Sequence, residues 1–232
     1  MSIVIPCYNE EGNIQHLVEK ISAMQKYEDV EFILVDNGSS DNTGSLLERA
    51  SEEHPNIRKA AVIKNIGYGN GIKCGIKEAQ GDFVGWTHAD AQVDPEDVLV
   101  AYRQIEENGS QDKFFKGIRD KSGRSLLDRL FTRFMGIFVS NILGTKMFDI
   151  NGQPNVYPGH MREAILQAPD DVMIEVYSYY IALRTGLEEK RYPVTFGKRL
   201  SGKSRLAPNL VAKLRTSLAT IQYALALRKE RK

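Results

Sequence analysis

The stretch SIVIPCYNEE, residues 2–11, decides the fold class of this chain. Its apolar, β-branched start predicts a strand at residues 2–6, which ends at Pro6. Apolar residues then recur at helical spacing, so a helix is expected at residues 11–25. A short apolar strand that runs directly into an amphipathic helix is typical of α/β proteins with a parallel sheet.

The same alternation continues outward from this stretch. Further strands are predicted at residues 31–36, 59–64 and 82–86, and further helices at 43–53 and 69–79. The pattern predicts a mostly parallel sheet flanked by helices on both faces, with right-handed crossovers. Ligands of such sheets bind at the carboxyl ends of the strands. The unusual polar residues of this chain lie at those ends.

The second half is more helical. It predicts a helix at 95–107 capped by Asp94, strands at 113–117 and 189–194, and helices at 124–143, 175–184 and 208–228. Two of these helices are amphipathic, with apolar residues on one face: Leu127, Leu130, Phe131, Phe134 and Phe138 in the first, and Leu210, Leu214, Leu218, Ile221 and Leu225 in the second. Packing on the core or in a dimer and contact with an anionic lipid surface are both open for these helices.

Charge is distributed unevenly along the 232 residues. The net charge is +1, but 13 of the 31 basic residues and only three of the 30 acidic residues follow residue 183, so this end carries +10 and the rest −9. A basic end indicates an anionic partner, which can be nucleic acid, a phosphorylated substrate or a membrane surface. The 42% hydrophobic and 26% charged fractions exclude a disordered or fibrous chain.

The sequence also predicts a compartment. Only two cysteines, Cys7 and Cys74, are present, which favours a reducing cytosol over a disulfide framework. The chain starts directly with a strand pattern, so we expect no secretory leader. The longest uncharged stretches, residues 134–145 and 216–227, have 12 residues each and are too short to cross a bilayer.

Two polar clusters follow the first two strands. In residues 6–11, the ring of Tyr8 can stack on a base, and the start of the helix offers free N–H groups. In residues 36–43, Asp41 and Thr43 fit an ordinary helix cap. Asp36 ends its strand too early to cap, so its carboxylate can accept hydrogen bonds from a nucleobase or ribose.

Two more clusters follow the next strands. The glycine-rich turn at residues 65–71 fails the dinucleotide fingerprint, because Ile72 or Cys74 stands at the third glycine position, and a nicotinamide oxidoreductase is disfavoured. In WTHADAQ, residues 86–92, strand alternation predicts that His88 and Asp90 reach one Mg²⁺ or Mn²⁺ that holds a diphosphate. Histidine suits Mn²⁺ better than Mg²⁺, but for His88 taken alone the favoured role is that of an uncoordinated hydrogen-bonding residue.

In this order the four clusters resemble the inverting glycosyltransferases of family 2, which have the Rossmann-like GT-A fold. The resemblance is strongest to the dolichyl-phosphate mannose synthase and polyprenyl-phosphate glycosyltransferase branch, and it extends from residue 3 to about residue 206. It implies a GT-A domain at 1–206, with a nucleotide-sugar-binding half at 1–108 and an acceptor-binding half at 109–206. A basic amphipathic helix at 207–232 follows.

The resemblance assigns donor-binding roles to residues that match the family's motifs: Pro6, Tyr8, Asn9, Glu10, Asp36, Asn65, Gly67, His88 and Gln92. Two positions depart from the motifs. Asn37 replaces the second Asp of the family's Asp-Asp-Gly-Ser segment, and His88 replaces the first Asp of its Asp-x-Asp metal motif, whose second Asp is Asp90. We expect retained activity with altered metal or ribose contacts, and an inactive or metal-independent protein is the alternative.

On the acceptor side, the segment 148–154 and the loop 199–205 resemble segments of the same branch, with Arg205 in place of a lysine. The resemblance implies phosphate or acceptor contacts for four residues: Gln153, Arg199, Lys203 and Arg205. A polyprenyl phosphate is already an anion, whereas a sugar hydroxyl needs a carboxylate base, for which Asp149 is the first candidate and Glu175 the second. The plainer interpretations make Asp149 an orienting group and Glu175 a helix-surface acid.

The expected function is transfer of a sugar from a nucleoside diphosphate sugar to a polyprenyl phosphate, with Mg²⁺ or Mn²⁺, on the inner face of the cytoplasmic membrane. The alternatives are a transferase that acts on a hydroxyl of a lipid-linked or polysaccharide acceptor, and a noncatalytic nucleotide-sugar-binding protein. Nucleic acid is disfavoured, because no interleaving of aromatic and basic residues accompanies the basic end. The sequence leaves open the sugar, the base and the oligomeric state.

Overall fold

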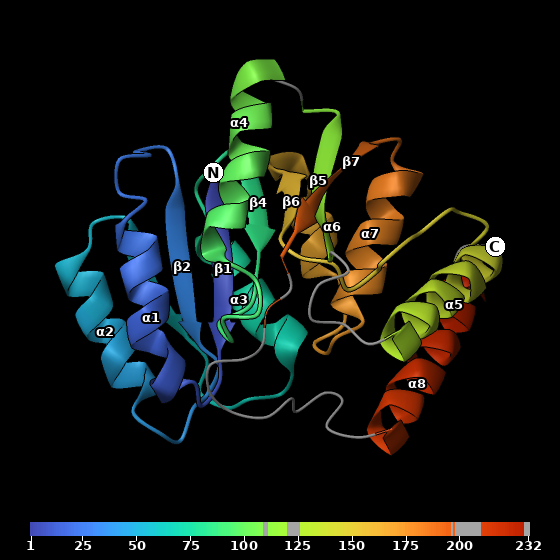
Figure 1. Cartoon of the computed structure of the whole chain (residues 1–232), viewed down its shortest axis with the longest axis horizontal. Helices are drawn as coiled ribbons and strands as arrows, with labels where there is room; N and C mark the ends of the chain where they lie inside the picture. Colours follow the sequence, from blue (N-terminus) through green and yellow to red (C-terminus); the bar gives the residue numbers. More distant parts are fainter. Residues whose placement is uncertain (109–110, 120–125, 196, 198–209, 230–232) are drawn as a thin grey trace.

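One mixed sheet forms the centre of the computed structural model, which describes residues 1–108, 111–119, 126–195, 197 and 210–229. Its order is β3-β2-β1-β4-β6-β5-β7 (Figure 1). The strands are β1 (Ser2–Cys7), β2 (Glu31–Asp36), β3 (Ile57–Ala61), β4 (Phe83–Trp86), β5 (Lys113–Arg119), β6 (Asn155–Pro158) and β7 (Glu188–Val194). Among these strands β6 alone pairs antiparallel with its neighbours, so the expected mostly parallel sheet is confirmed.

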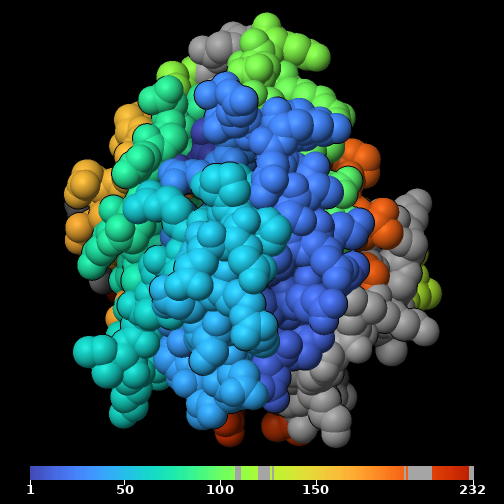
Figure 2. Space-filling view, turned by 90° about the vertical axis from the view of Figure 1, so that its left-hand side faces the viewer, coloured from blue at the N-terminus to red at the C-terminus, as the bar shows by residue number. Residues whose placement is uncertain are grey.

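Helices cover both faces of this sheet. They are α1 (Glu11–Ser22), α2 (Thr43–Glu53), α3 (Tyr68–Glu78), α4 (Val98–Asn108), α5 (Leu126–Leu143), α6 (Arg162–Leu166), α7 (Ile174–Arg184) and α8 (Leu210–Lys229), with 3₁₀ turns at η1 (Pro95–Asp97) and η2 (Gly159–Met161). Alternate residues of β1 divide the core: Ile3 and Ile5 pack with α1, α2 and α4, and Val4 packs with α3 and α7. Figure 2 shows α1 and α2 side by side on one flank.

Most predicted elements appear within a few residues of their expected bounds, and the cap at Asp94 is confirmed, because its side chain accepts a hydrogen bond from the Glu96 N–H at 3.0 Å. The prediction missed β6. That strand has only four residues, all of them buried, and it ends in a proline, so it shows neither alternation nor the usual length. Since β6 joins β4 to β5, it unites the first and second halves of the chain in one sheet.

Helices α5 and α8 pack against each other beside the sheet, at the right of Figure 1. Their inner residues Val139, Leu143, Ala224 and Leu227 are buried in the core. Their outer residues form what we call the apolar face, made of large exposed side chains: Leu126, Leu130, Phe134, Ile137 and Phe138 of α5, and Val211, Leu214, Leu218 and Leu225 of α8. None of the helices in the described part of the chain has the length and apolarity that a membrane span requires.

Candidate functional site

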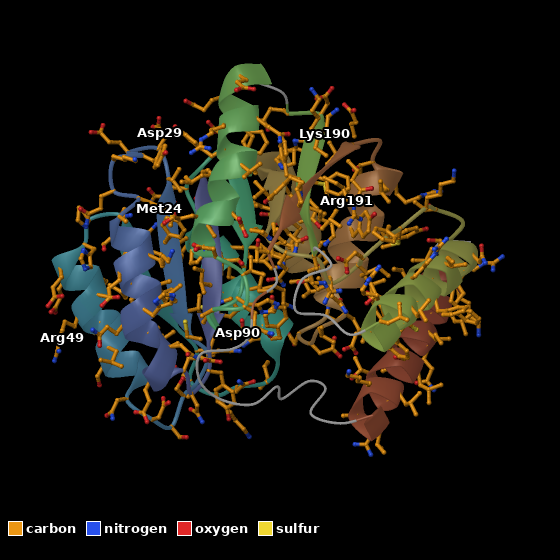
Figure 3. The ribbon with its side chains drawn as sticks, in the orientation of Figure 1. Met24, Asp29, Arg49, Asp90, Lys190 and Arg191 are labelled. Carbon is orange, nitrogen blue, oxygen red and sulfur yellow. The ribbon has the colours of Figure 1, made fainter. Side chains whose placement is uncertain are left out.

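Two carboxylates lie at one edge of the sheet. Asp36 is the last residue of β2 and pairs in register with Cys7, the last residue of β1. Asp90 follows β4, the other neighbour of β1, and is 4% exposed. Figure 3 shows Asp90 at the lower edge of the sheet, opposite Asp29, which precedes β2. The carboxyl ends of β1, β2 and β4 therefore meet at this edge, as the sequence predicted.

The loops after β1 and β2 are held together by hydrogen bonds. The Asn9 N–H donates to Ser39 Oγ at 3.0 Å, and the Ser40 N–H donates to Asn9 Oδ1 at 2.7 Å. The Glu10 N–H donates to Thr43 Oγ1 at 2.8 Å. Asn9 has a left-handed backbone with φ 53°, a conformation that asparagine tolerates well. These residues build the rim of the edge and keep Pro6 and Tyr8, both half-buried, beside Asp36.

Asp36 is fixed by its own loop, because its Oδ1 accepts a hydrogen bond from the Ser39 N–H at 2.9 Å. A Cβ on Gly44 would lie 2.5 Å from Asp36 Oδ2, so only glycine permits this approach of α2. The N-cap of α2 is Asn42, which makes no side-chain capping bond, so the capping interpretation of Asp41 and Thr43 is wrong. Asp41 lies one residue before the cap, where its carboxylate accepts a hydrogen bond from the N–H of Thr43 at 3.0 Å. Asp36 is thus oriented without being a cap.

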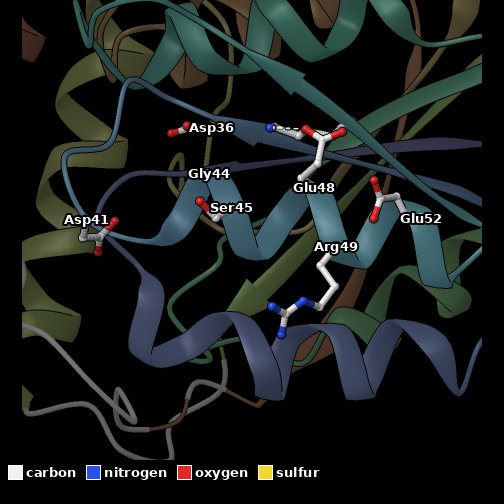
Figure 4. A pocket seen from close by; sticks show the side chains of 8 residues that line it. Asp36, Asp41, Gly44, Ser45, Glu48, Arg49 and Glu52 are labelled. Atoms are coloured by element: carbon white, nitrogen blue, oxygen red, sulfur yellow. Dashed lines mark hydrogen bonds and ion pairs between the residues drawn. The ribbon is translucent and has the colours of Figure 1, made fainter.

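A pocket of about 520 Å³ lies behind Asp36, along α2 (Figure 4). Its lining residues are Asp36, Asp41, Gly44, Ser45, Glu48, Arg49, Glu52 and Lys59. Four of these eight residues are acidic, and Lys59 is already paired with Glu48. Because like charges repel, this pocket does not suit a diphosphate.

Asn37 explains one departure from the family pattern. It is 3% exposed, and its Nδ2 donates a hydrogen bond to the Gly67 carbonyl at 3.1 Å. An ionised aspartate has no proton to donate, so the amide ties the loop after β2 to the turn that contains Asn65. Gly67 has φ 150°, and a Cβ there would collide with the carbonyl of Asp170. This glycine therefore has a packing role in addition to its predicted donor role.

The prediction from strand alternation is wrong for His88, because β4 ends at Trp86 and the residue lies in the following loop. The ring of His88 stacks on Tyr68, with centroids 5.7 Å apart and planes at 30°. Burial raises the pKa of Tyr68 well above its usual value, and the charges of Glu175 and Asp90 raise it further. Tyr68 therefore contacts His88 and feels the charge of Asp90, and the two candidate ligands lie two residues apart in the same loop.

The loop after β4 is anchored at its far end. Asp90 Oδ1 accepts a hydrogen bond from the Gln92 N–H at 3.0 Å, and Gln92 Nε2 donates to the Gly197 carbonyl at 3.2 Å. The predicted phosphate-binding residues Arg199, Lys203 and Arg205 lie outside the described residues. Among residues that are described, no three His, Cys, Asp or Glu side chains form a metal-binding group.

Glu175 is 1% exposed, so its interpretation as a helix-surface acid is wrong. Its Oε1 accepts from Trp86 Nε1 at 2.8 Å and from Gln153 Nε2 at 2.7 Å. Its Oε2 accepts from Asn155 Nδ2 at 2.9 Å and lies 3.8 Å from Lys116 Nζ. A carboxylate with both oxygens occupied by buried partners orients those partners and is poorly placed to take a proton.

Gln153 and Lys116 complete this buried network. Gln153 Nε2 donates its second proton to the Tyr68 hydroxyl at 2.6 Å, so its amide has no proton left for the predicted phosphate contact. Lys116 Nζ donates to the carbonyls of Ile150 and Gly152 at 2.9 Å each. Burial lowers the pKa of Lys116 to about 8. The network connects the strand ends to the loop that carries Asp149.

Asp149, the first candidate base, forms an ion pair with Arg119 at the end of β5. Its carboxylate accepts from the Arg119 backbone N–H at 3.1 Å and from Nε at 3.0 Å. Asp149 is 1% exposed and has φ 40°, a left-handed backbone. The guanidinium thus occupies both carboxylate oxygens, which supports the orienting role.

The sequence prediction missed Tyr68, Lys116 and Arg119. Tyr68 lies inside the glycine-rich turn that was considered only for its glycines. Lys116 follows two phenylalanines in a buried strand, and a lysine at such a position is a usable signal of a buried ion pair. Arg119 ends the same strand, and nothing in the local sequence links it to Asp149, 30 residues away.

Comparison with known proteins agrees with this geometry. Residues 2–157 match the family model described as Glycosyl transferase family 2. Proteins named undecaprenyl-phosphate 4-deoxy-4-formamido-L-arabinose transferase, from Yersinia enterocolitica and Proteus mirabilis, are 32% and 31% identical to the chain over 190 residues. The matches cover 80% of this chain and 57% of those proteins, so the chain spans little more than half the length of these relatives.

Solved structures show the same fold. Glucosyl-3-phosphoglycerate synthase from Mycobacterium tuberculosis, in complex with Mn²⁺, UDP-glucose and glycerol 3-phosphate, gives a TM-score of 0.68 at 22% identity over 97% of this chain and 79% of that one. A mannosyltransferase from Pyrobaculum calidifontis, with GDP-Man and Mn²⁺, gives 0.64 at 18% identity over 98% and 69%. The expected GT-A fold is confirmed.

Proposed function

The chain belongs to glycosyl transferase family 2, and we propose that it transfers a sugar from a nucleoside diphosphate sugar to a polyprenyl phosphate at a membrane surface. The observation that carries the donor half of this proposal is the meeting of Asp36 and Asp90 at one sheet edge. Parallel sheets bind nucleotides at that edge. In the proposal Asp36 accepts hydrogen bonds from the base or ribose, beside the ring of Tyr8.

The side chains near Asp90 fit a divalent cation. A carboxylate oxygen and an imidazole nitrogen are a donor set suited to Mn²⁺, and two protein ligands leave coordination positions for diphosphate oxygens. Asp90 would hold the cation with His88, and the bound cation would neutralise the charge that develops on the leaving diphosphate. Both solved structures described above are complexes with Mn²⁺, which supports a divalent cation.

The acceptor half rests on the two candidate bases. Transfer to a sugar hydroxyl needs a carboxylate that takes its proton. Asp149 is held by Arg119, and Glu175 is buried in the network with Lys116. A phosphate oxygen is already an anion and needs no such base. The engaged carboxylates therefore favour a phosphate acceptor over a hydroxyl acceptor, in agreement with the names of the two sequence relatives.

The apolar face supports a lipid acceptor. Phe134 is 69% exposed and Leu218 is 61% exposed, and the same two helices carry exposed basic residues such as Arg133 and Arg215. Such helices lie at a membrane interface with their apolar side chains in the acyl boundary and their cations at anionic headgroups. We propose the cytoplasmic face, where the free thiols of Cys7 and Cys74 stay reduced.

Nucleotide binding is the direct test of this function. Thermal unfolding and donor hydrolysis are measured with UDP- and GDP-sugars, with and without Mn²⁺. A ligand at 100 times its Kd should stabilise the chain by about 2.7 kcal/mol. That corresponds to a rise in Tm of roughly 5 to 10 °C for a chain of this size. A chain that responds to no nucleotide sugar under either condition is not a transferase.

A further inference from the structure

Tyr68 connects two parts of the site that are far apart in sequence. It is the first residue of α3, directly after Gly67. Its ring stacks on the ring of His88, and its hydroxyl accepts a hydrogen bond from Gln153 Nε2 at 2.6 Å. One end of this side chain therefore contacts the loop after β4, and the other end contacts the buried network.

The buried network is a firm support for the Tyr68 hydroxyl. Gln153 is 2% exposed, and its amide nitrogen bonds Tyr68 and Glu175 together. Glu175 is bound in turn by Trp86, and its charge is balanced by Lys116, which is fully buried. Gln153 Oε1 is buried without a described partner, but movement of this residue would also break both buried hydrogen bonds of its Nε2, which restrains the Tyr68 hydroxyl.

His88 has a different environment. It is half-buried, and within the described residues neither ring nitrogen has a hydrogen-bond partner. The stacking on Tyr68 is thus the described contact that restrains the plane of the imidazole. An aspartate, which the family motif has at this position, is short and has no ring to orient. The imidazole of His88 must be held in one plane to bind a cation, and the ring of Tyr68 restrains that plane.

We propose that Tyr68 is a positioning residue that orients the imidazole of His88 toward a divalent cation and thereby makes this site prefer Mn²⁺ to Mg²⁺. The preference follows because an imidazole nitrogen is a better ligand for Mn²⁺ than for Mg²⁺, which takes hard oxygen ligands. The proposal rests on the proposed function, and it concerns only the nucleotide and cation side of the site. It needs no acceptor for its test.

The test is a double-mutant cycle on nucleotide binding, without turnover. UDP and GDP are titrated with MnCl₂ or MgCl₂, and binding is followed by calorimetry and by the fluorescence of Trp86, the single tryptophan of the chain. Tyr68→Leu removes the platform, Tyr68→Phe keeps the ring, and His88→Asp restores the carboxylate of the family motif. Tyr27→Leu is the matched control, because it removes a ring from the Tyr27–Tyr102 pair far from the site.

Tyr68→Leu should weaken Mn²⁺-dependent nucleotide binding by about tenfold or more, the usual effect of losing a residue that orients a metal ligand. Tyr68→Phe and Tyr27→Leu should change it less than about threefold. In the His88→Asp background the preference for Mn²⁺ should fall, and Tyr68→Leu should have less than about a twofold effect, because the coupled partner is gone.

Equal effects of Tyr68→Leu in both backgrounds, or equal effects with Mn²⁺ and Mg²⁺, would overturn the proposal. If Tyr68→Leu does not fold, the proposal is tested with His88→Asp alone. An unchanged preference for Mn²⁺ over Mg²⁺ in that variant also overturns the proposal. These results leave the proposed function intact as long as the wild-type chain binds a nucleotide with a cation. A wild-type chain that binds neither UDP nor GDP instead contradicts the proposed function and the metal role of His88 together.

Discussion

The edge at the carboxyl ends of the strands and the helix pair α5 and α8 differ in which side chains they bury and which they expose. At the edge, polar groups are buried and hydrogen-bonded, as Asp90 and Glu175 illustrate. On α5 and α8, large apolar groups such as Phe134 and Leu218 are exposed. Burying polar groups and exposing apolar groups both cost free energy of folding. A protein with both features has a use for each, and the difference fits one substrate that is dissolved in water and one that is held in a membrane.

The comparison separates the expected effects of substitutions. A change at the edge alters polar groups that have buried partners, so it should affect chemistry or stability. A change on the apolar face alters groups that have few partners in the folded chain, so it should affect membrane binding alone.

Asp90→Asn should reduce turnover by about 10³-fold, the upper range for loss of one electrostatic contact to the developing charge. The change keeps the shape of the side chain, so the Tm should fall little. The matched control is Asp82→Asn, an exposed acid that precedes β4 and lies outside the site. Turnover is measured by release of the nucleoside diphosphate. Full activity of Asp90→Asn would show that the carboxylate of Asp90 does not take part in the reaction.

Glu175→Gln should lower the free energy of unfolding by about 3 to 5 kcal/mol, because it leaves the buried charge of Lys116 without its counter-charge. Urea denaturation measures the effect. Glu163→Gln on α6, where the side chain is exposed, should change stability by less than about 0.5 kcal/mol. A Glu175→Gln chain that keeps its stability and loses only kcat would make Glu175 a catalytic base and contradict its orienting role.

Phe134→Ser combined with Leu218→Ser should weaken binding to vesicles that contain anionic lipid by about tenfold or more. Each side chain contributes roughly 1.5 kcal/mol when it enters an apolar environment. Binding is measured by vesicle sedimentation at low and high salt. The control is Ile63→Ser, because Ile63 is a fully exposed apolar residue before the glycine-rich turn. This variant should bind vesicles as wild type does. Equal sedimentation of the double variant and wild type would show that the apolar face does not meet the membrane.

Asp97 gives the smallest expected effect. Burial raises its pKa to about 6, and the charges of Asp94 and Glu96 add to the shift. The folded chain therefore binds this proton more tightly than the unfolded chain, so the carboxyl stabilises the fold below about pH 4 and that stability is lost as the pH rises through 6. After allowance for solvent screening, wild type should lose about 1 kcal/mol relative to Asp97→Asn between pH 4 and pH 7. A constant difference across that range would contradict the shift.

The sequence predicted the sheet and its edge because local patterns decide them. Apolar β-branched runs predicted β1, β2 and β4, and the polar residues after each run marked the edge. Glu175 could not be interpreted in this way. Helix α7 is buried on nearly all sides, so its sequence has no polar face against which an internal acid would be noticed.

Contacts between distant residues explain the other failures. The ion pair of Arg119 with Asp149 and the bond from Gln153 to Tyr68 join residues 30 and 85 positions apart, and no periodicity reports such pairs. The alternation argument for His88 failed for a local reason, because β4 stops at Trp86 and its spacing rule stops with it. The sequence therefore predicted which residues meet at the edge better than it predicted how they are held.

Transfer of the sugar to a polyprenyl phosphate can be tested against transfer to a lipid-linked sugar. A labelled nucleotide sugar that stabilises the chain is supplied with Mn²⁺ and anionic vesicles that contain either undecaprenyl phosphate or a lipid-linked sugar. Labelled lipid is then extracted and separated. We expect product with undecaprenyl phosphate, because its phosphate oxygen attacks without a base. Product with the lipid-linked sugar alone would contradict this expectation.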